Sequence, residues 1–403
     1  MVHSQRDVTL LFTARSIRLF AYGALSVVLA LYLHVAGLTG AAIGLLFTLT
    51  LAGDAGISLW ITTTADRLGR KRMLVLGAGL MVLAGVVFSL TGDPVLLMLA
   101  GIVGVISPSG NEIGPFLSLE QAALSQLLPS EDRTRAFAWY NVAGSFSAAC
   151  GALLGGFLSK GLMHIGFTEL ASYRSVILLY AACGSVLVVL FLFLSAQVEA
   201  APDATVKQRV LGLHTSKGIV LKLSGLFALD AFAGGFVIQS MVAYWFHVKF
   251  NLDAGLLGSI FFGANLLAGV SALLAVPLAN RIGLINTMVF THIPSNVLLC
   301  LVPFMPTAGL AVFVLLLRFS ISQMDVPTRQ SYTMAVVAPD ERSAASGITT
   351  IARSVGASFS PALAGVLLAS PALLGAPFFI AGGLKIIYDL LLYRSFRKAD
   401  IRT

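Results

Sequence analysis

Twelve continuous apolar runs set what this chain can fold into, and most are about 20 residues long or longer. A run of this length crosses the hydrocarbon core of a bilayer as a helix, because only a helix satisfies its own backbone hydrogen bonds in lipid. The sequence therefore predicts an all-α integral membrane protein with twelve transmembrane helices. We place the spans at roughly 9–33, 39–62, 73–91, 95–127, 136–160, 173–197, 218–246, 252–278, 285–304, 308–334, 344–369 and 376–394.

Composition excludes the alternatives to a helical membrane protein. Of 403 residues, 57% are hydrophobic and 11% are charged, whereas a soluble chain carries about 45–50% apolar and about 25% charged residues. So few charges cannot cover a water-facing surface, which excludes a soluble enzyme, and the chain is too apolar to be disordered. The strands of a transmembrane β-barrel alternate in polarity, whereas these runs are continuous.

The longest polar stretch, Glu199–Lys217, lies between the sixth and seventh spans and divides the chain into two six-helix halves. We predict an N-terminal bundle over 1–198, a cytoplasmic central loop over 199–217 and a C-terminal bundle over 218–403.

The two halves repeat each other in sequence. Ala65-Asp66-Arg67-Leu68-Gly69 recurs as Ala279-Asn280-Arg281-Ile282-Gly283, each after the second span of its half, at an offset of 214 residues. A six-span duplication returns the chain to the same side of the membrane, so the halves are parallel repeats. Such bundles are pseudo-symmetric, with a solute site near the midplane between them.

The distribution of basic residues predicts the orientation. With the N-terminus inside, 17 basic residues fall in inner segments and 3 in outer loops. This bias predicts that both termini lie in the cytoplasm. The predicted location is the inner membrane of the cell. The bias also explains the net charge of +8 by contact with anionic membrane lipid, so nucleic acid is not expected as a partner.

The loop between the second and third spans resembles the signature loop of the major facilitator superfamily. The family pattern is a Gly, three residues and then Asp-Arg-x-Gly-Arg-Arg/Lys, and this chain has Thr62 in place of the Gly. The resemblance covers the whole chain, and it implies a cytoplasmic latch in the N-terminal half. The implied latch residues are Asp66, Arg67, Gly69, Arg70, Glu131 and Arg133.

The same resemblance implies a secondary transporter, not an enzyme, that works by alternating access, with the first, fourth, seventh and tenth helices lining a central cavity. Two patterns of the family's drug antiporters are incomplete. Ala152 replaces the proline of a Gly-rich run in the fifth span, and the arginine early in the fourth span is absent, although Arg318 occupies the equivalent position in the second half.

Ionisable residues inside the spans mark the predicted site, because buried charges are costly and usually functional. Six basic and six acidic residues lie within spans, which indicates mutual pairing. We predict that substrate is bound by Arg18, Tyr22, Asn111, Asp230, Arg318 and Arg353, and that protons are bound by Glu112, Asp325 and Asp54. Snorkelling of Arg18 to the interface remains an alternative, and Lys385 and Asp389 fit a structural pair one helical turn apart.

No Gly-Lys-Ser/Thr phosphate loop occurs, so the predicted energy source is an ion gradient, and carboxylates at membrane depth suit protons. We predict a monomeric, proton-coupled transporter that exports small organic or amphipathic compounds. A symporter or exchanger of a small organic anion, or a lipid flippase, remains open. No cofactor and no metal is expected, since no histidine has metal-ligand spacing to another histidine or cysteine.

Overall fold

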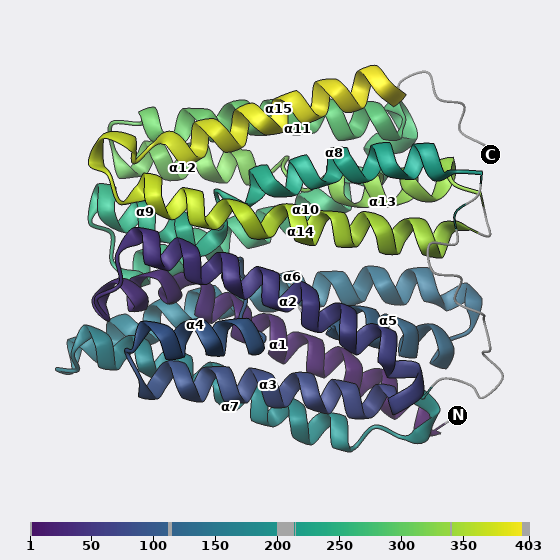
Figure 1. Ribbon diagram of the computed structural model, residues 1–403, viewed down its shortest axis with the longest axis horizontal. Coiled ribbons are helices and arrows are strands. Elements are labelled where there is room, and N and C mark those ends of the chain that lie inside the picture. The colour runs from purple at the N-terminus through teal and green to yellow at the C-terminus, as the bar shows by residue number, and fades with distance from the viewer. Residues whose placement is uncertain (1, 112–114, 200–212, 214, 339–340, 397–403) are drawn as a thin grey trace. The chain divides into compact units, whose positions relative to one another are not determined.

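A computed structural model describes residues 2–111, 115–199, 213, 215–338 and 341–396 (Figure 1). Within these ranges the secondary structure is helical and contains no strand. Ten of the described helices are long and apolar enough to cross a membrane, and two shorter apolar helices accompany them. The prediction of a multi-pass, all-α membrane protein is confirmed.

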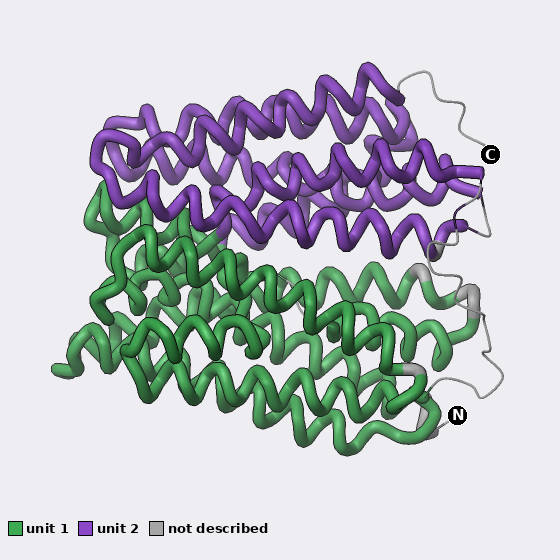
Figure 2. Tube along the Cα trace, in the orientation of Figure 1, with its two compact units in different colours: residues 1–205, 239–262 green, residues 206–238, 263–403 purple. Residues whose placement is uncertain are grey.

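The chain divides into two compact units (Figure 2). Unit 1 comprises residues 1–205 and 239–262, and unit 2 comprises 206–238 and 263–403. The boundaries expected from the sequence, at residues 198 and 218, remain predictions.

Unit 1 is built on the first six predicted spans. Its helices are α1 (Val2–Val35), α2 (Gly40–Leu68), α3 (Arg70–Leu90), α4 (Pro94–Val103), α5 (Phe116–Leu127), α6 (Ser130–His164) and α7 (Glu169–Leu192), followed by the short 3₁₀ helix η1 (Ala196–Val198). It also includes α9 (Gln239–Phe250) and the first residues of α10 (Ala254–Ile282).

Unit 2 holds the remaining helices. They are α8 (Lys217–Gly235), most of α10, α11 (Leu284–Leu301), η2 (Val302–Phe304), α12 (Ala308–Phe319), α13 (Asp325–Val336), α14 (Arg342–Leu368), η4 (Pro371–Leu373) and α15 (Ala376–Phe396).

The fourth, seventh and tenth predicted spans are each two helices. They consist of α4 and α5, α8 and α9, and α12 and α13. In the fourth span, Gly110 has a φ of 70°, and the Ser107 hydroxyl donates to the Asn111 carbonyl oxygen at 2.8 Å. The structure therefore shows full interruptions of the helix in these spans. Breaks of this kind are typical of transporter helices that surround a solute site.

The repeated sequences form equivalent corners. Gly69 lies between α2 and α3 with a φ of 101°, and Gly283 lies between α10 and α11 with a φ of 85°. Side chains rarely adopt this left-handed conformation, which glycine allows at no steric cost. The repeat seen in the sequence is therefore also a repeat of backbone geometry.

Helices α1 and α6 pack with their backbones in contact. A Cβ atom added to Gly151 of α6 would lie 1.9 Å from the Phe20 carbonyl oxygen, and one added to Gly23 of α1 would lie 2.0 Å from the Ala148 carbonyl oxygen. Small residues drive helix association in membranes because they allow this close approach.

We expect Gly151→Ala to lower the free energy of unfolding by about 1–3 kcal/mol, because the added methyl group must push the two helices apart. Gly161→Ala is the matched control on the same helix, since no atom lies within 4 Å of its added Cβ. Thermal unfolding of the purified proteins in detergent measures both. Equal unfolding midpoints for the two variants would contradict the close contact.

Candidate functional site

A buried ion pair joins α1 to α5 in unit 1. Arg18 binds Glu120 through both ends of its guanidinium, with Nη1–Oε1 at 2.7 Å and Nη2–Oε2 at 2.6 Å, and both side chains are fully buried. The Tyr140 hydroxyl donates to the same carboxylate, and the guanidinium lies 4.5 Å from the centre of the Phe116 ring. Arg18 therefore does not snorkel, and its charge is matched within the unit.

The other predicted site residues of unit 1 lie in the first, second and fourth predicted spans. Tyr22 is fully buried in α1, Asn111 is exposed at the break in the fourth span, and the Ser58 hydroxyl donates to half-buried Asp54 at 3.4 Å. Glu112 lies outside the described residues. The structure thus shows an Arg18–Glu120 ion pair, and substrate binding by the other residues stays a prediction.

In unit 2 a single carboxylate holds two cations from two different helices. Asp230 of α8 accepts from Arg329 Nη1 of α13 at 3.0 Å on one oxygen, and from Lys385 Nζ of α15 at 2.6 Å on the other. All three side chains are nearly buried. Asp230 is therefore the point at which three helices of unit 2 are tied together by charge.

The break in the tenth span separates two charged helix ends. Arg318 lies in the last turn of α12 and Asp325 in the first turn of α13. A cation at a C-terminus and an acid at an N-terminus each complement the helix dipole. Asp325 also pairs with Arg329, one turn along α13, at 3.2 Å.

Positive charge is in excess within this cluster. Arg318 and Arg353 have no carboxylate within ion-pair distance among the described residues, and the Nε atom of each is buried without a hydrogen-bond acceptor. Both nevertheless lie within electrostatic range of Asp230 and Asp325. We call the following residues the unit 2 charge cluster: Asp230, Arg318, Asp325, Arg329, Arg353, Lys385 and Asp389. It holds four cations and three acids.

Asp389 does not pair with Lys385 as the helical spacing suggested. Its Oδ1 lies 2.9 Å from His292 Nδ1 of α11, and its Oδ2 accepts from Asn296 Nδ2 at 3.3 Å. All three residues are buried. The sequence did not point to this contact, because helical spacing does not show which neighbouring helix faces Asp389.

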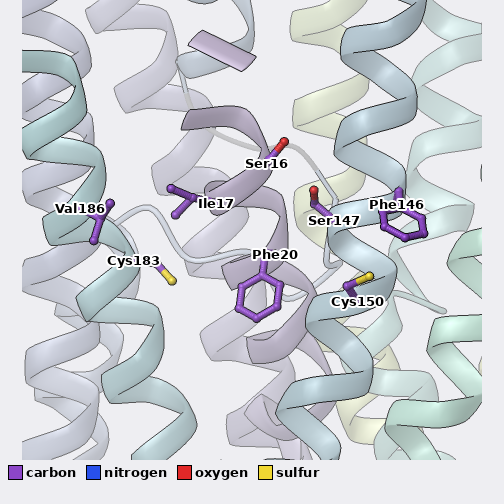
Figure 3. A pocket seen from close by; sticks show the side chains of 8 residues that line it. All are labelled: Ser16, Ile17, Phe20, Phe146, Ser147, Cys150, Cys183 and Val186. Atoms are coloured by element: carbon purple, nitrogen blue, oxygen red, sulfur yellow. The ribbon is translucent and has the colours of Figure 1, made fainter. Parts of the chain in front are cut away.

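An apolar pocket of about 470 Å³ lies between α1, α6 and α7 of unit 1 (Figure 3). No charged side chain lines it, so it is separate in chemistry from both ion-paired clusters. Its lining residues are Ser16, Ile17, Phe20, Phe146, Ser147, Cys150, Cys183 and Val186.

Comparison with known proteins identifies the family. The sequence profile of the Major Facilitator Superfamily matches residues 11–361. The chain belongs to the Major Facilitator Superfamily. It is also 30% identical, over 99% of its own length and 96% of the relative's, to the uncharacterized membrane protein YJR124C of Saccharomyces cerevisiae.

Solved structures of superfamily transporters share the fold. A bacterial homolog of the human lysosomal transporter Spinster matches with a TM-score of 0.76 and 15% identity, covering 98% of this chain and 97% of that one. The nucleoside transporter NupG matches with a TM-score of 0.73 and 15% identity over 97% and 99%. The human organic anion transporter MFSD10 matches with a TM-score of 0.64 and 18% identity over 96% and 99%. This superfamily member is therefore a transporter and not an enzyme.

The superfamily repeat relates the two ion pairs with their signs exchanged. Arg18 precedes Asp230 by 212 positions and Glu120 precedes Arg329 by 209, close to the offset of 214 between the repeated loops. The first helix of one half thus carries the cation where the first helix of the other carries the acid. The acid in unit 1 binds Arg18 and the Tyr140 hydroxyl, whereas the acid in unit 2 is shared by Arg329 and Lys385.

The signature loop of the superfamily is bound by an acid that the sequence analysis did not select. The Glu199 carboxylate accepts from the backbone amides of Arg70 at 2.6 Å and Lys71 at 3.4 Å, so it caps the start of α3. The Arg70 side chain donates to Gln126 at 3.0 Å. In unit 2, Glu341 likewise accepts from two backbone amides at the start of α8.

Of the other latch residues, Arg67 is exposed and Arg133 donates to the Leu128 carbonyl oxygen at 3.1 Å. The side chains of Asp66 and Glu131 lie outside the described part of the chain. The latch therefore stays a prediction, with Glu199 as the acid that holds the Gly69 corner.

The described residues contain no group of three or more histidine, cysteine or acidic side chains placed to hold a metal ion.

Proposed function

We propose that this transporter moves a small organic anion by alternating access, with protons as the coupling ion. The observation that carries the proposal is the excess positive charge of the unit 2 charge cluster. Arg318 and Arg353 lie within predicted membrane spans and have no acidic partner among the described residues.

The energetics favour an anionic solute over a neutral one. A charge within a span is costly unless it is paired, and four cations against three acids leave one positive charge without a match. A guanidinium binds carboxylate, sulfonate or phosphate groups through two parallel hydrogen bonds. An anion in contact with these two arginines would supply the missing charge and the missing acceptors.

The comparisons are compatible with this solute class. One structural neighbour is an organic anion transporter and another a nucleoside transporter, and at such low identity they support the fold alone. The sequence predicted export of small organic or amphipathic compounds. Such compounds could bind the same cluster if they carry an acidic group.

The remaining sequence-based assignments extend this proposal. Asp230 organises the cluster, and the sequence assigns proton binding to Asp325, Asp54 and Glu112. Of these, Asp325 is tied to Arg329 by an ion pair. Arg18, Tyr22 and Asn111 are the unit 1 residues predicted to bind substrate. A monomer in the inner membrane with cytoplasmic termini is the predicted setting.

We expect wild-type protein in proteoliposomes to exchange at least one of the labelled carboxylates benzoate, succinate and citrate, and to ignore their neutral amides. Arg318→Gln and Arg353→Gln should each lower this counterflow by about 10–100-fold, since each removes one or more charge-assisted hydrogen bonds. They should remain folded, because each removes a cation without an acidic partner.

Arg394→Gln is the matched control, because Arg394 is an exposed arginine at the end of α15 in the same unit. It should exchange carboxylates at the wild-type rate. Exchange of the amides at the same rate as the acids, or wild-type rates in both cluster variants, would overturn the proposal.

A further inference from the structure

His292 and Asp389 share one proton across two helices of unit 2. Their Nδ1 and Oδ1 atoms are 2.9 Å apart, a contact that needs a hydrogen between two basic atoms. With one proton the pair carries a charge of −1, and with a second proton on the imidazole it is neutral. The two protonation states of the pair therefore differ by one charge.

The other acids of the cluster are less suited to take a proton. Asp230 is bound by Lys385 and Arg329, and Asp325 by Arg329, so protonation of either breaks an ion pair. Asp389 has no lysine or arginine within ion-pair distance among the described residues. A second proton on the His292–Asp389 pair therefore changes the charge of unit 2 without breaking an ion pair.

Within the unit 2 charge cluster, Lys385 connects this pair to Asp230. Its Nζ lies 2.6 Å from Asp230 Oδ1, and it precedes Asp389 by one turn of α15, a spacing at which side chains meet. When the His292–Asp389 pair is neutral, Asp230 is the stronger partner for Lys385. When the pair carries −1, Asp389 competes for Lys385 and one oxygen of Asp230 becomes available to the neighbouring arginines.

The groups that face the pair come from four helices. From α15 they are Lys385 and Tyr388, whose ring lies edge-on to His292 with centroids 6.1 Å apart. Asp230 of α8 lies within electrostatic range of His292, and Arg329 of α13 binds Asp230. On α11 itself, Asn296 donates to Asp389 in either protonation state.

We propose that His292 and Asp389 form the proton-binding site of this transporter, and that Lys385 transmits its protonation state to the anion-binding arginines. This rests on the proposed anion transport. A bound proton adds one positive charge beside the cluster and raises its affinity for an anion, and by linkage a bound anion raises the proton affinity by the same factor. Proton and anion therefore move together, as a symport.

The test uses proteoliposomes and the carboxylate that gives the largest wild-type counterflow among benzoate, succinate and citrate. Wild type should accumulate it when the outside is acidic. His292→Gln and Asp389→Asn should each lose about tenfold or more of the pH-driven accumulation, the size expected for one charge near the site. His164→Gln, an exposed histidine of unit 1, is the matched control and should accumulate like wild type.

The two variants should have opposite effects on the rate of carboxylate exchange. Asp389→Asn fixes the pair near neutral and should exchange well at all pH values, whereas His292→Gln fixes it at −1 and should exchange poorly at all pH values. Retention of pH-driven accumulation by both variants would overturn the assignment. If instead the wild type exchanges no carboxylate, the proposed function fails, which is a separate result.

Asn296→Asp provides a second test if His292→Gln or Asp389→Asn does not fold. A second carboxylate beside Asp389 should hold the proton more tightly and move the pH midpoint of carboxylate exchange upward. An unchanged midpoint in this variant would also overturn the assignment.

Discussion

Glu120→Gln should lower the free energy of unfolding by about 3–5 kcal/mol, because it leaves the Arg18 guanidinium buried without its counter-charge. The effect is expected to be this large because both side chains are fully buried and joined by two short hydrogen bonds. The unfolding midpoint of the purified protein, and its yield as a single peak in size-exclusion chromatography, measure the loss.

The exchanged pair Arg18→Glu with Glu120→Arg should recover at least half of that loss, since unit 2 already carries the opposite polarity at equivalent positions. Lys160→Gln is the control, because it removes an ion pair with Asp253 whose side chains are 50% and 44% exposed. Such surface pairs contribute about 1 kcal/mol or less. A loss in Glu120→Gln no larger than in this control would show that the buried pair does not hold unit 1 together.

Asp230→Asn should abolish carboxylate exchange and cost about 3–5 kcal/mol of stability, because it leaves two nearly buried cations without the acid they share. Lys385→Gln should cost far less, since Asp230 keeps Arg329 as its partner. The double variant Asp230→Asn with Lys385→Gln restores the number of excess charges. It should regain most of the stability without regaining exchange.

Unfolding midpoints and counterflow, measured on the same preparations, separate these outcomes. Recovery of exchange in the double variant would mean that Asp230 only balances charge and does not position Arg329. Equal stability losses for the Asp230 and Lys385 single variants would contradict the sharing of one carboxylate by two cations.

The spans and the twofold repeat could be predicted from the sequence because both depend on local properties. Apolar length identifies a span, and the Gly69 and Gly283 corners repeat because each needs a left-handed residue. The breaks in the fourth, seventh and tenth spans could not be located in this way. Hydropathy measures only how apolar a segment is, so it does not reveal where the backbone of a span is interrupted.

The charge cluster was only partly predictable. Helical spacing shows which residues share a face of one helix, but not which helix faces them. Lys385 and Asp389 therefore fitted a local pair, whereas the structure gives them Asp230 and His292 as partners on other helices. The equal number of acids and bases within spans indicated mutual pairing. Among the described residues the structure shows pairs for Arg18, Arg329 and Lys385, but no acid within ion-pair distance of Arg318 or Arg353. The partners depend on the packing of distant segments.

The proposed anion site is tested most directly by thermal stabilisation of the purified transporter. The measurement compares an organic acid with its uncharged amide. The pairs are benzoate and benzamide, succinate and succinamide, and citrate and its triamide. A ligand that binds only the folded protein raises the unfolding midpoint, and the shift grows with the ratio of its concentration to its Kd. We predict that at least one acid stabilises the wild type while its amide does not, and that the double variant Arg318→Gln with Arg353→Gln loses this shift. Equal stabilisation by an acid and its amide, or an undiminished shift in the double variant, would contradict an anion site at these arginines.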